Sequence, residues 1–207
     1  GRSWKLRQKS LELWPKWINF LQIYNSKLKF ERPLFKLTSD KENFERLSTF
    51  ANKYPNDGLE IVKANSKILS QCNKLFKGNE FQGVISHHDG RINPKILLDT
   101  LNTVLKTKNI KMINDQVIQL EKRFQKWTLK LKTGEILTSE IIILCNSLDS
   151  LKLINTDLCN IKLKPVLGQA IEIINKEENT NFLSLPHLLN INGKNLITIS
   201  KEKIIIG

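Results

Sequence analysis

Five consecutive apolar residues at positions 141–145, Ile-Ile-Ile-Leu-Cys, constrain the fold of this chain more than any other segment. A strand with one face in water alternates apolar and polar residues, whereas a strand buried between two layers is apolar on both faces. The run therefore predicts a strand buried in a parallel sheet. Before it, residues 110–137 alternate in polarity around a Thr133-Gly134 turn, which predicts an antiparallel meander. We expect the chain to pass from one sheet into another near residue 141.

Helical patterns dominate the part of the chain before residue 110. Trp14 and Ile18 belong to a series of apolar residues at three- and four-residue spacing, which predicts an amphipathic helix that Pro15 either kinks or restarts. Asn93-Pro94 predicts the start of another helix, because asparagine accepts hydrogen bonds from free backbone N–H groups and proline fits the first turn. Apolar spacing carries this second helix to about residue 107.

Shorter elements complete the pattern. We expect strands over residues 29–37 and 59–62, helices after Ser39 and over 65–78, and a strand from Gly83 to a tight Asp89-Gly90 turn. Towards the end of the chain we expect a strand through residue 174, a polar loop, and strands near 195–199 and 203–206. Together these patterns predict an α+β protein.

Composition excludes some classes of protein and leaves others open. Lys and Arg number 33 against 20 Asp and Glu, a formal charge of +13 that would suit a polyanion. The lysines are spread along the whole chain, however, and no basic run is interleaved with stacking aromatics, so nucleic acid is not the favoured partner. No apolar run approaches the roughly 20 residues that cross a bilayer, and we expect no membrane contact.

The histidines and cysteines do not predict a metal site. His87 and His88 are adjacent on a predicted strand, so their side chains point to opposite faces. Cys72, Cys145 and Cys159 are far apart and lack the spacing of a zinc site or a disulfide framework. A reducing, cytoplasmic setting is expected.

The order of the signals in residues 83–174 resembles that of a known family. This order is similar to that of the glycine oxidase and D-amino-acid oxidase family of flavoproteins. It runs from a strand through Asp89-Gly90, Asn93-Pro94, a long helix and a hairpin to the 141–145 strand and then residues 165–169, Pro-Val-Leu-Gly-Gln. The resemblance extends from about Ser10 to Gly207, although residues 10–82 only agree with it. It implies an FAD-dependent oxidoreductase that transfers a hydride to the flavin from the CH–NH group of glycine, a D-amino acid or a related small amine.

This resemblance implies a domain organisation. Residues 1–82 would be the helical and strand part of a mixed-sheet substrate domain with flanking helices. Residues 83–163 would be part of an FAD-binding, Rossmann-like domain, and residues 164–207 would return to the substrate-domain sheet. The resemblance is also compatible with an oligomer.

The resemblance also implies positions for the site, although it assigns no catalytic side chain. The adenosine half of FAD would contact the backbone at Val117 and the turn formed by Cys145, Asn146 and Ser147, because backbone at the carboxyl ends of strands approaches a dinucleotide closely. Candidates for the substrate pocket are Arg91, Gln169 and Asn195.

Three departures from the family pattern lead us to expect that this segment is inactive by itself. It has no Gly-x-Gly-x-x-Gly motif, Ser147 stands where the family has a glycine, and the arginine that clamps the substrate carboxylate would lie beyond Gly207. One alternative is a non-catalytic, basic binding module on the same scaffold, which would bind an acidic partner such as RNA. Another is a flavoprotein that takes part in tRNA modification.

Overall fold

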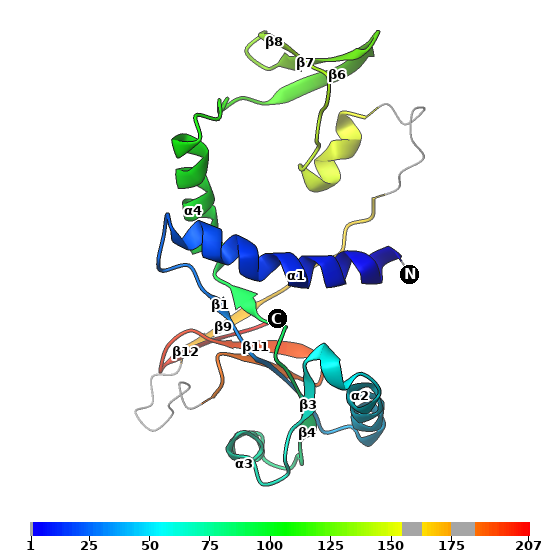
Figure 1. Cartoon of the computed structure of the whole chain (residues 1–207), viewed down its shortest axis with the longest axis vertical. Helices are drawn as coiled ribbons and strands as arrows, with labels where there is room; N and C mark the ends of the chain where they lie inside the picture. The colour runs from blue at the N-terminus through cyan, green and yellow to red at the C-terminus, as the bar shows by residue number, and fades with distance from the viewer. Residues whose placement is uncertain (1, 155–162, 175–184) are drawn as a thin grey trace. The chain divides into compact units, whose positions relative to one another are not determined.

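A computed structural model describes residues 2–154, 163–174 and 185–207 of the chain. The chain forms two compact units (Figure 1), one made of Gly1–Asn109 and Gln169–Gly207 and the other of Ile110–Gly168. Both mix helices with sheets, so the predicted α+β class is confirmed. Cys159 and the first part of the polar loop expected after residue 174 lie outside the described residues, and the rest of that expected loop contains a strand over Leu188–Ile191.

A seven-stranded sheet forms the centre of the first unit. Its strands, in spatial order, are β3 (Leu59–Ile61), β4 (Gln82–Ser86), β2 (Leu34–Thr38), β10 (Leu188–Ile191), β11 (Lys194–Thr198), β12 (Lys203–Ile206) and β9 (Ile171–Ile174). Every neighbouring pair is antiparallel except β2 and β10, which run parallel. The parallel pair brings residues from the two ends of the sequence side by side at the middle of the sheet.

One face of this sheet is covered by helix α3 (Lys67–Leu75). Ile68, Leu69 and Cys72 of this helix are buried against strand residues that include Leu37 and Leu189, the latter fully buried. Helix α2 (Lys41–Lys53) contacts β4 and β3. Because side chains alternate across a strand, residues next to those buried under α3 lie on the other face of the sheet.

Helices α1 (Arg2–Gln22) and α4 (Pro94–Thr107) pack together in a second core with the short strands β1 (Phe30–Glu31) and β5 (Arg91–Ile92). Ile18 and Leu21 are buried there. Pro15 lies inside α1, which is one helix of 21 residues rather than two. The predicted cap of α4 is confirmed, because the Asn93 side chain accepts hydrogen bonds from the backbone of Lys95 and Ile96.

The second unit contains the predicted antiparallel meander. Its strands are β6 (Val117–Arg123), β7 (Lys126–Leu131) and β8 (Ile136–Ser139). The Asp115 carboxylate accepts hydrogen bonds from the backbone of Gln116 and from Thr133. The Thr133 side chain, followed by the Gln116 backbone, lowers the pKa of Asp115. A 3-10 helix, η2 (Ser147–Lys152), follows the meander, and another, η1 (Pro55–Asp57), belongs to the first unit.

The predicted buried strand over 141–145 is wrong. This segment is not assigned to a strand, and Ile141 and Ile143 are 76% and 82% exposed. A strand needs ladder partners for its backbone and apolar layers for its side chains. The described part of the chain offers no pairing partner to this segment.

Other predictions are corrected in detail. His87 and His88 form a bend, Asp89 and Gly90 form no tight turn, and residues 111–113 are not a strand. The strand expected over 29–37 is divided into β1 and β2 at Pro33. In the described residues, no helix is long and apolar enough to cross a bilayer.

Candidate functional site

Two of the three predicted pocket residues, Gln169 and Asn195, lie on either side of Gly207. The Asn195 backbone N–H donates to the Gly207 carbonyl oxygen at 2.7 Å, and the Gly207 N–H donates back at 2.9 Å. A Cβ atom added to Gly207 would lie 3.3 Å from the Gln169 carbonyl oxygen. The sheet therefore brings together segments that are 26 residues apart in sequence (195 minus 169).

The side chain of Asn195 belongs to a polar row across three neighbouring strands. Asn190 of β10 pairs with Asn195 of β11, and Lys36 of β2 pairs with Asn190, so all three side chains leave the same face of the sheet. Their strand neighbours Leu37, Leu189 and Leu196 are buried under α3, which places the row on the opposite face. Lys36, Asn190 and Asn195 are called the polar row below.

Hydrogen bonding fixes the two amides of the polar row. Asn190 Nδ2 donates to Asn195 Oδ1 at 2.9 Å. Asn190 Oδ1 is buried and has no hydrogen-bond partner among the described residues. Neither Lys36 nor Asn195 Nδ2 pairs with another described side chain, and both residues are exposed. The Lys36 ammonium and Asn195 Nδ2 are therefore donors without a side-chain partner among the described residues.

The third predicted pocket residue, Arg91, is engaged in holding strands together. Its Nε donates to the Glu31 carboxylate, so the pair joins β5 to β1. Its Nη2 donates to the carbonyl oxygen of Thr198 at 3.3 Å, and Thr198 is fully buried. Thr198 lies three residues from Asn195 along β11, a rise of about 10 Å. Arg91 thus contacts β11 away from the polar row.

The predicted cofactor residues are all in the second unit. Cys145 and Asn146 are exposed, and Ser147 has φ of +54°, the left-handed backbone conformation that favours glycine. Asn146 Oδ1 accepts a hydrogen bond from Ser150 Oγ at 2.6 Å, which holds the turn in place. Ser147 therefore adopts a backbone conformation that glycine reaches at no steric cost.

Backbone exposure at this turn suits a dinucleotide. The backbone N–H and C=O groups of residues 142–145 form no hydrogen bond with other described backbone groups. Val117 begins β6 and pairs with Leu131. Between the described residues, no ladder or hydrogen bond joins Val117 to Cys145, Asn146 or Ser147. Val117, Cys145, Asn146 and Ser147 all stay predictions as cofactor contacts.

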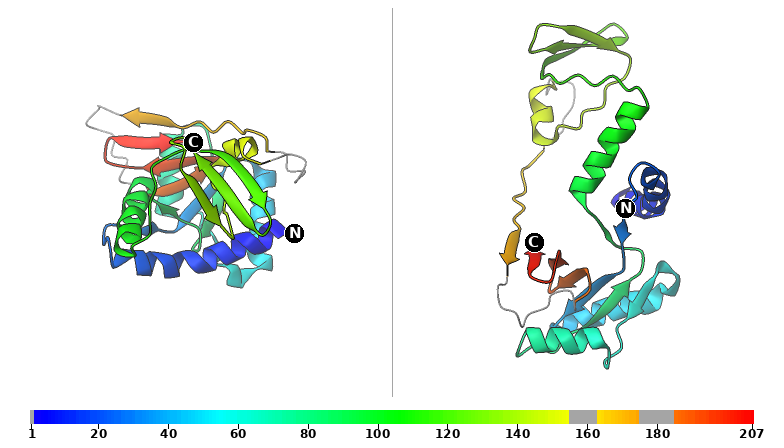
Figure 2. Two further views of the ribbon diagram at one scale, coloured as in Figure 1. Left: turned by 90° about the horizontal axis from the view of Figure 1, so that it is seen from above. Right: turned by 90° about the vertical axis from the view of Figure 1, so that its left-hand side faces the viewer.

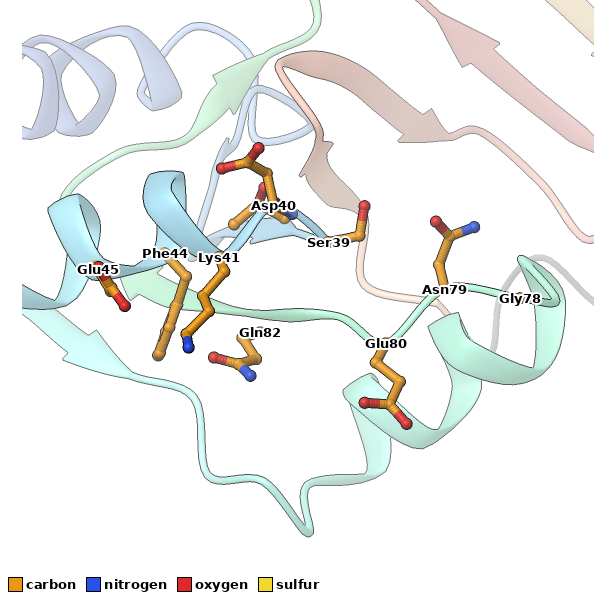
Figure 3. A pocket seen from close by; sticks show the side chains of 10 residues that line it. Ser39, Asp40, Lys41, Phe44, Glu45, Gly78, Asn79, Glu80 and Gln82 are labelled. Atoms are coloured by element: carbon orange, nitrogen blue, oxygen red, sulfur yellow. Dashed lines mark hydrogen bonds between the residues drawn. The ribbon is translucent and has the colours of Figure 1, made fainter.

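A cavity of about 440 Å³ is found at the start of α2 (Figure 3). Ser39, Asp40 and Lys41 line one side of it, and residues 78–80 and Gln82 line the other. Asp40 is already the cap of α2, because it accepts a hydrogen bond from the Asn43 N–H at 2.7 Å. The lining mixes both signs of charge and contains none of the predicted site residues.

Two free thiols differ sharply in their chemistry. Cys72 is fully buried under the sheet, and burial raises the pKa of its thiol to about 11. Cys145 is exposed. Of the two cysteines that the structure describes, only Cys145 is therefore accessible to a solvent reagent.

Lys36 and Asn190 are site residues that the sequence reasoning missed. Asn190 belongs to β10, which was expected to be a polar loop. A signal for the β10–β11 hairpin was present in Asn192-Gly193, whose φ angles of +49° and +83° are those of a type I′ turn. Lys36 has no comparable local signal.

Comparisons with known proteins agree with this fold. The family model described as FAD dependent oxidoreductase matches residues 1–207. A search of curated proteins found no match. Glycine oxidase from Geobacillus kaustophilus is similar in structure, with a TM-score of 0.73, 14% identity, and coverage of 98% of this chain and 54% of that one.

Two further solved structures are similar over nearly the whole chain. Iminodiacetate oxidase from Chelativorans sp. BNC1 gives a TM-score of 0.70 at 15% identity, covering 99% of this chain and 56% of that one. L-proline dehydrogenase from P. horikoshii gives 0.64 at 15% identity, with 97% and 53% covered. The chain thus spans about half the length of these proteins. Because the family model matches every residue, the chain belongs to the FAD dependent oxidoreductase family.

Proposed function

We propose that the protein containing this chain oxidises the CH–NH group of glycine, a D-amino acid or a related small amine. The match of the family model over residues 1–207 is the observation that supports it most. Three proteins of similar fold are named as a glycine oxidase, an iminodiacetate oxidase and an L-proline dehydrogenase, all of them enzymes of amino or imino acids. FAD, when bound, accepts the hydride from the carbon atom that carries the nitrogen.

The residues that would hold FAD are those of the exposed turn, together with Val117. The Cys145 backbone forms no hydrogen bond with other described backbone groups, and Ser147 adopts the glycine-like conformation. Backbone groups can then contact an adenosine without interference from a long side chain. The protein's part in this reaction is to orient the cofactor and the substrate and to exclude water, so few catalytic side chains are needed.

On the substrate side, the candidates are Asn195 and Gln169, which lie around Gly207. Arg91 remains a candidate, but its guanidinium already forms an ion pair with the Glu31 carboxylate. An arginine that pairs with a carboxylate in the fold is less available to a substrate anion, because it would have to give up one partner for the other.

Purification of the full-length gene product tests this proposal. A visible absorption spectrum typical of oxidised flavin is expected, and it should bleach without oxygen when glycine or a D-amino acid is added. Substrates that lack a C–H bond next to nitrogen, such as 2-aminoisobutyrate, are the matched control and should cause no bleaching. A colourless product that takes up no FAD on incubation would contradict the proposal.

A further inference from the structure

We propose that helix α1 docks the protein on an anionic lipid surface, with the helix axis parallel to the plane of the membrane. The proposal goes beyond the proposed function and does not depend on it. It departs from the expectation of no membrane contact, which rested on the lack of an apolar run long enough to cross a bilayer. A helix that lies in the membrane surface needs no such run.

Large apolar side chains of α1 stay in solvent although the helix is packed. Ile18 is only 4% exposed, in the core that α1 shares with α4. The right-hand view of Figure 2 shows α1 nearly end-on, with α4 beside it. Leu6, Trp17 and Phe20, in contrast, are 72%, 55% and 44% exposed. These three residues and the half-buried Leu13 are called the exposed stripe below.

A row of lysines lies beside the exposed stripe around the helix axis. Successive residues of an α-helix are about 100° apart, so the exposed stripe covers about 60° of the helix surface over a length of about 21 Å. Lys5, Lys9 and Lys16 lie within about 40° of one another next to the stripe, and all three are exposed. Ile18 and Leu21 lie on the opposite side of the stripe. The order around α1 is therefore a buried face, an exposed apolar face and a cationic face.

Aromatic contacts hold the exposed stripe in place before any partner binds. The Trp17 ring lies 6.0 Å from the ring of Trp14, which packs against the core of α1 and α4. The Phe20 ring lies 5.6 Å from the Tyr24 ring. Tryptophan and tyrosine are the residues that gather where a membrane meets water, because their rings are apolar and carry a polar group. Docking of a stripe that is already ordered costs little conformational entropy.

The charge of α1 matches an anionic surface. The helix carries five basic residues and one acidic residue, Glu12. Glu12 is paired with Lys9 at 3.0 Å, whereas Lys5 and Lys16 have no ion-pair partner among the described residues. Lysine can lay its apolar stem along the exposed stripe and extend its ammonium group to a lipid phosphate. Basic residues near a membrane surface are attracted by anionic lipids.

A helix of another protein fits the exposed stripe less well. Two helices that pack along a seam interlock aliphatic side chains at alternating spacings of three and four residues. In α1 the position between Leu6 and Leu13 in this spacing is Ser10, and the positions after Leu13 are the large rings of Trp17 and Phe20. Lipid chains adapt to such an uneven surface. The observations therefore favour a bilayer as the occupant.

Flotation of the full-length gene product with vesicles tests the proposal. The protein should float with vesicles of phosphatidylcholine and phosphatidylglycerol mixed two to one, and stay at the bottom with vesicles of phosphatidylcholine alone. Rising salt should weaken the binding, because it screens the attraction of the lysines to the lipid. Brominated lipids should quench the tryptophan fluorescence of the wild type more than that of Trp17→Phe. No flotation with the anionic vesicles, or equal flotation with both kinds, would overturn the proposal.

Variants identify α1 as the part of the protein that binds. Phe20→Ser should lower the affinity for anionic vesicles about tenfold or more, and Lys16→Gln about fivefold. Phe50→Ser and Lys41→Gln make the same changes at exposed positions of α2, where Phe50 is 40% exposed, and should bind like the wild type. Equal losses in the two sets would contradict a site on α1. Circular dichroism shows which variants are folded, and bromolipid quenching of the wild type decides the question where one is not.

A soluble quencher separates the membrane from a protein segment as the occupant. In the full-length protein without vesicles, iodide should quench Trp17, measured as the difference between the wild type and Trp17→Phe. Protection of Trp17 from iodide would mean that protein covers the exposed stripe, and it would overturn the proposal. None of these measurements requires bound flavin or turnover, so their failure would leave the proposed function standing.

Discussion

Substitution of Gly83 by alanine should be among the most damaging single changes in the sheet. Gly83 of β4 stands opposite Leu37 of β2. A Cβ atom added there would lie 2.1 Å from the Lys36 carbonyl oxygen and 2.9 Å from the Leu37 Cα atom. Carbon and oxygen atoms normally approach to about 3.3 Å, so β2 and β4 would have to separate locally by roughly 1 Å.

The cost of this separation has two parts. Overpacking of a well-packed site costs about 1–3 kcal/mol, and each weakened backbone hydrogen bond adds about 1 kcal/mol. The Gly83 carbonyl oxygen also accepts a hydrogen bond from the Val62 N–H at 2.9 Å, which the shift would disturb. We therefore expect the free energy of unfolding to fall by about 3–4 kcal/mol, a large share of the 5–15 kcal/mol that a typical domain has.

Urea unfolding, followed by circular dichroism and by hydrogen exchange of peptides from β2 and β4, measures this loss. Gly168→Ala is the matched control, since a Cβ at Gly168 meets nothing within 4 Å and its φ is not positive. The control should change stability by less than about 0.5 kcal/mol. If Gly83→Ala unfolds at the same urea concentration as Gly168→Ala, the close approach of β2 and β4 described here is wrong.

Three further predictions concern local features. A thiol reagent at pH 8 should modify Cys145 quickly and Cys72 only after unfolding, which peptide mass mapping measures. The reason is that a pKa raised from 9.0 to about 11 lowers the thiolate fraction of Cys72 about 100-fold. Ser147→Gly should raise the free energy of unfolding by about 0.5–1 kcal/mol in urea titrations, since Ser147 has φ of +54°; a loss of stability would refute the assigned backbone conformation. Asn93→Ala should lower it by about 1 kcal/mol through loss of the α4 cap, whereas Asn102→Ala on the same helix should not; equal effects would contradict the capping argument.

The elements that the sequence could predict are those with local causes. The start of α4 follows from Asn93 and Pro94, whose backbone and side-chain chemistry act within one turn of helix. The meander follows from alternation and from Gly134, whose φ of +95° is accessible to glycine at no steric cost. Such signals lie within a few residues of the structure that they determine.

Whether the 141–145 segment is buried does not depend on local sequence alone. An apolar run shows that a segment can be buried, but the partners that would cover it come from elsewhere in the chain or in the assembly. Ile141 and Ile143 have the composition of a buried strand and nevertheless lie in solvent in the described structure. Periodicity alone therefore cannot decide whether such a run is a strand.

Only part of the polar row could have been predicted from the sequence. Asn190 and Asn195 are five positions apart and joined by an Asn192-Gly193 turn, so their pairing could have been inferred from the hairpin. Lys36 reaches the row only through the parallel pairing of β2 with β10, across 154 positions of the chain (190 minus 36). Contacts between parallel strands need a long connection, whose path no short motif specifies.

The cofactor candidates and the substrate candidates belong to different units of the chain. The cofactor candidates Val117 and residues 145–147 belong to the unit of Ile110–Gly168, whereas the polar row and Arg91 belong to the other. Changes in stability are expected to add when the substituted residues share no partner. The effects of Gly83→Ala in the first unit and Ser147→Gly in the second on the free energy of unfolding should therefore add in the double variant. A double variant whose change differs from the sum of the two single changes by more than about 0.5 kcal/mol would show that the units are coupled.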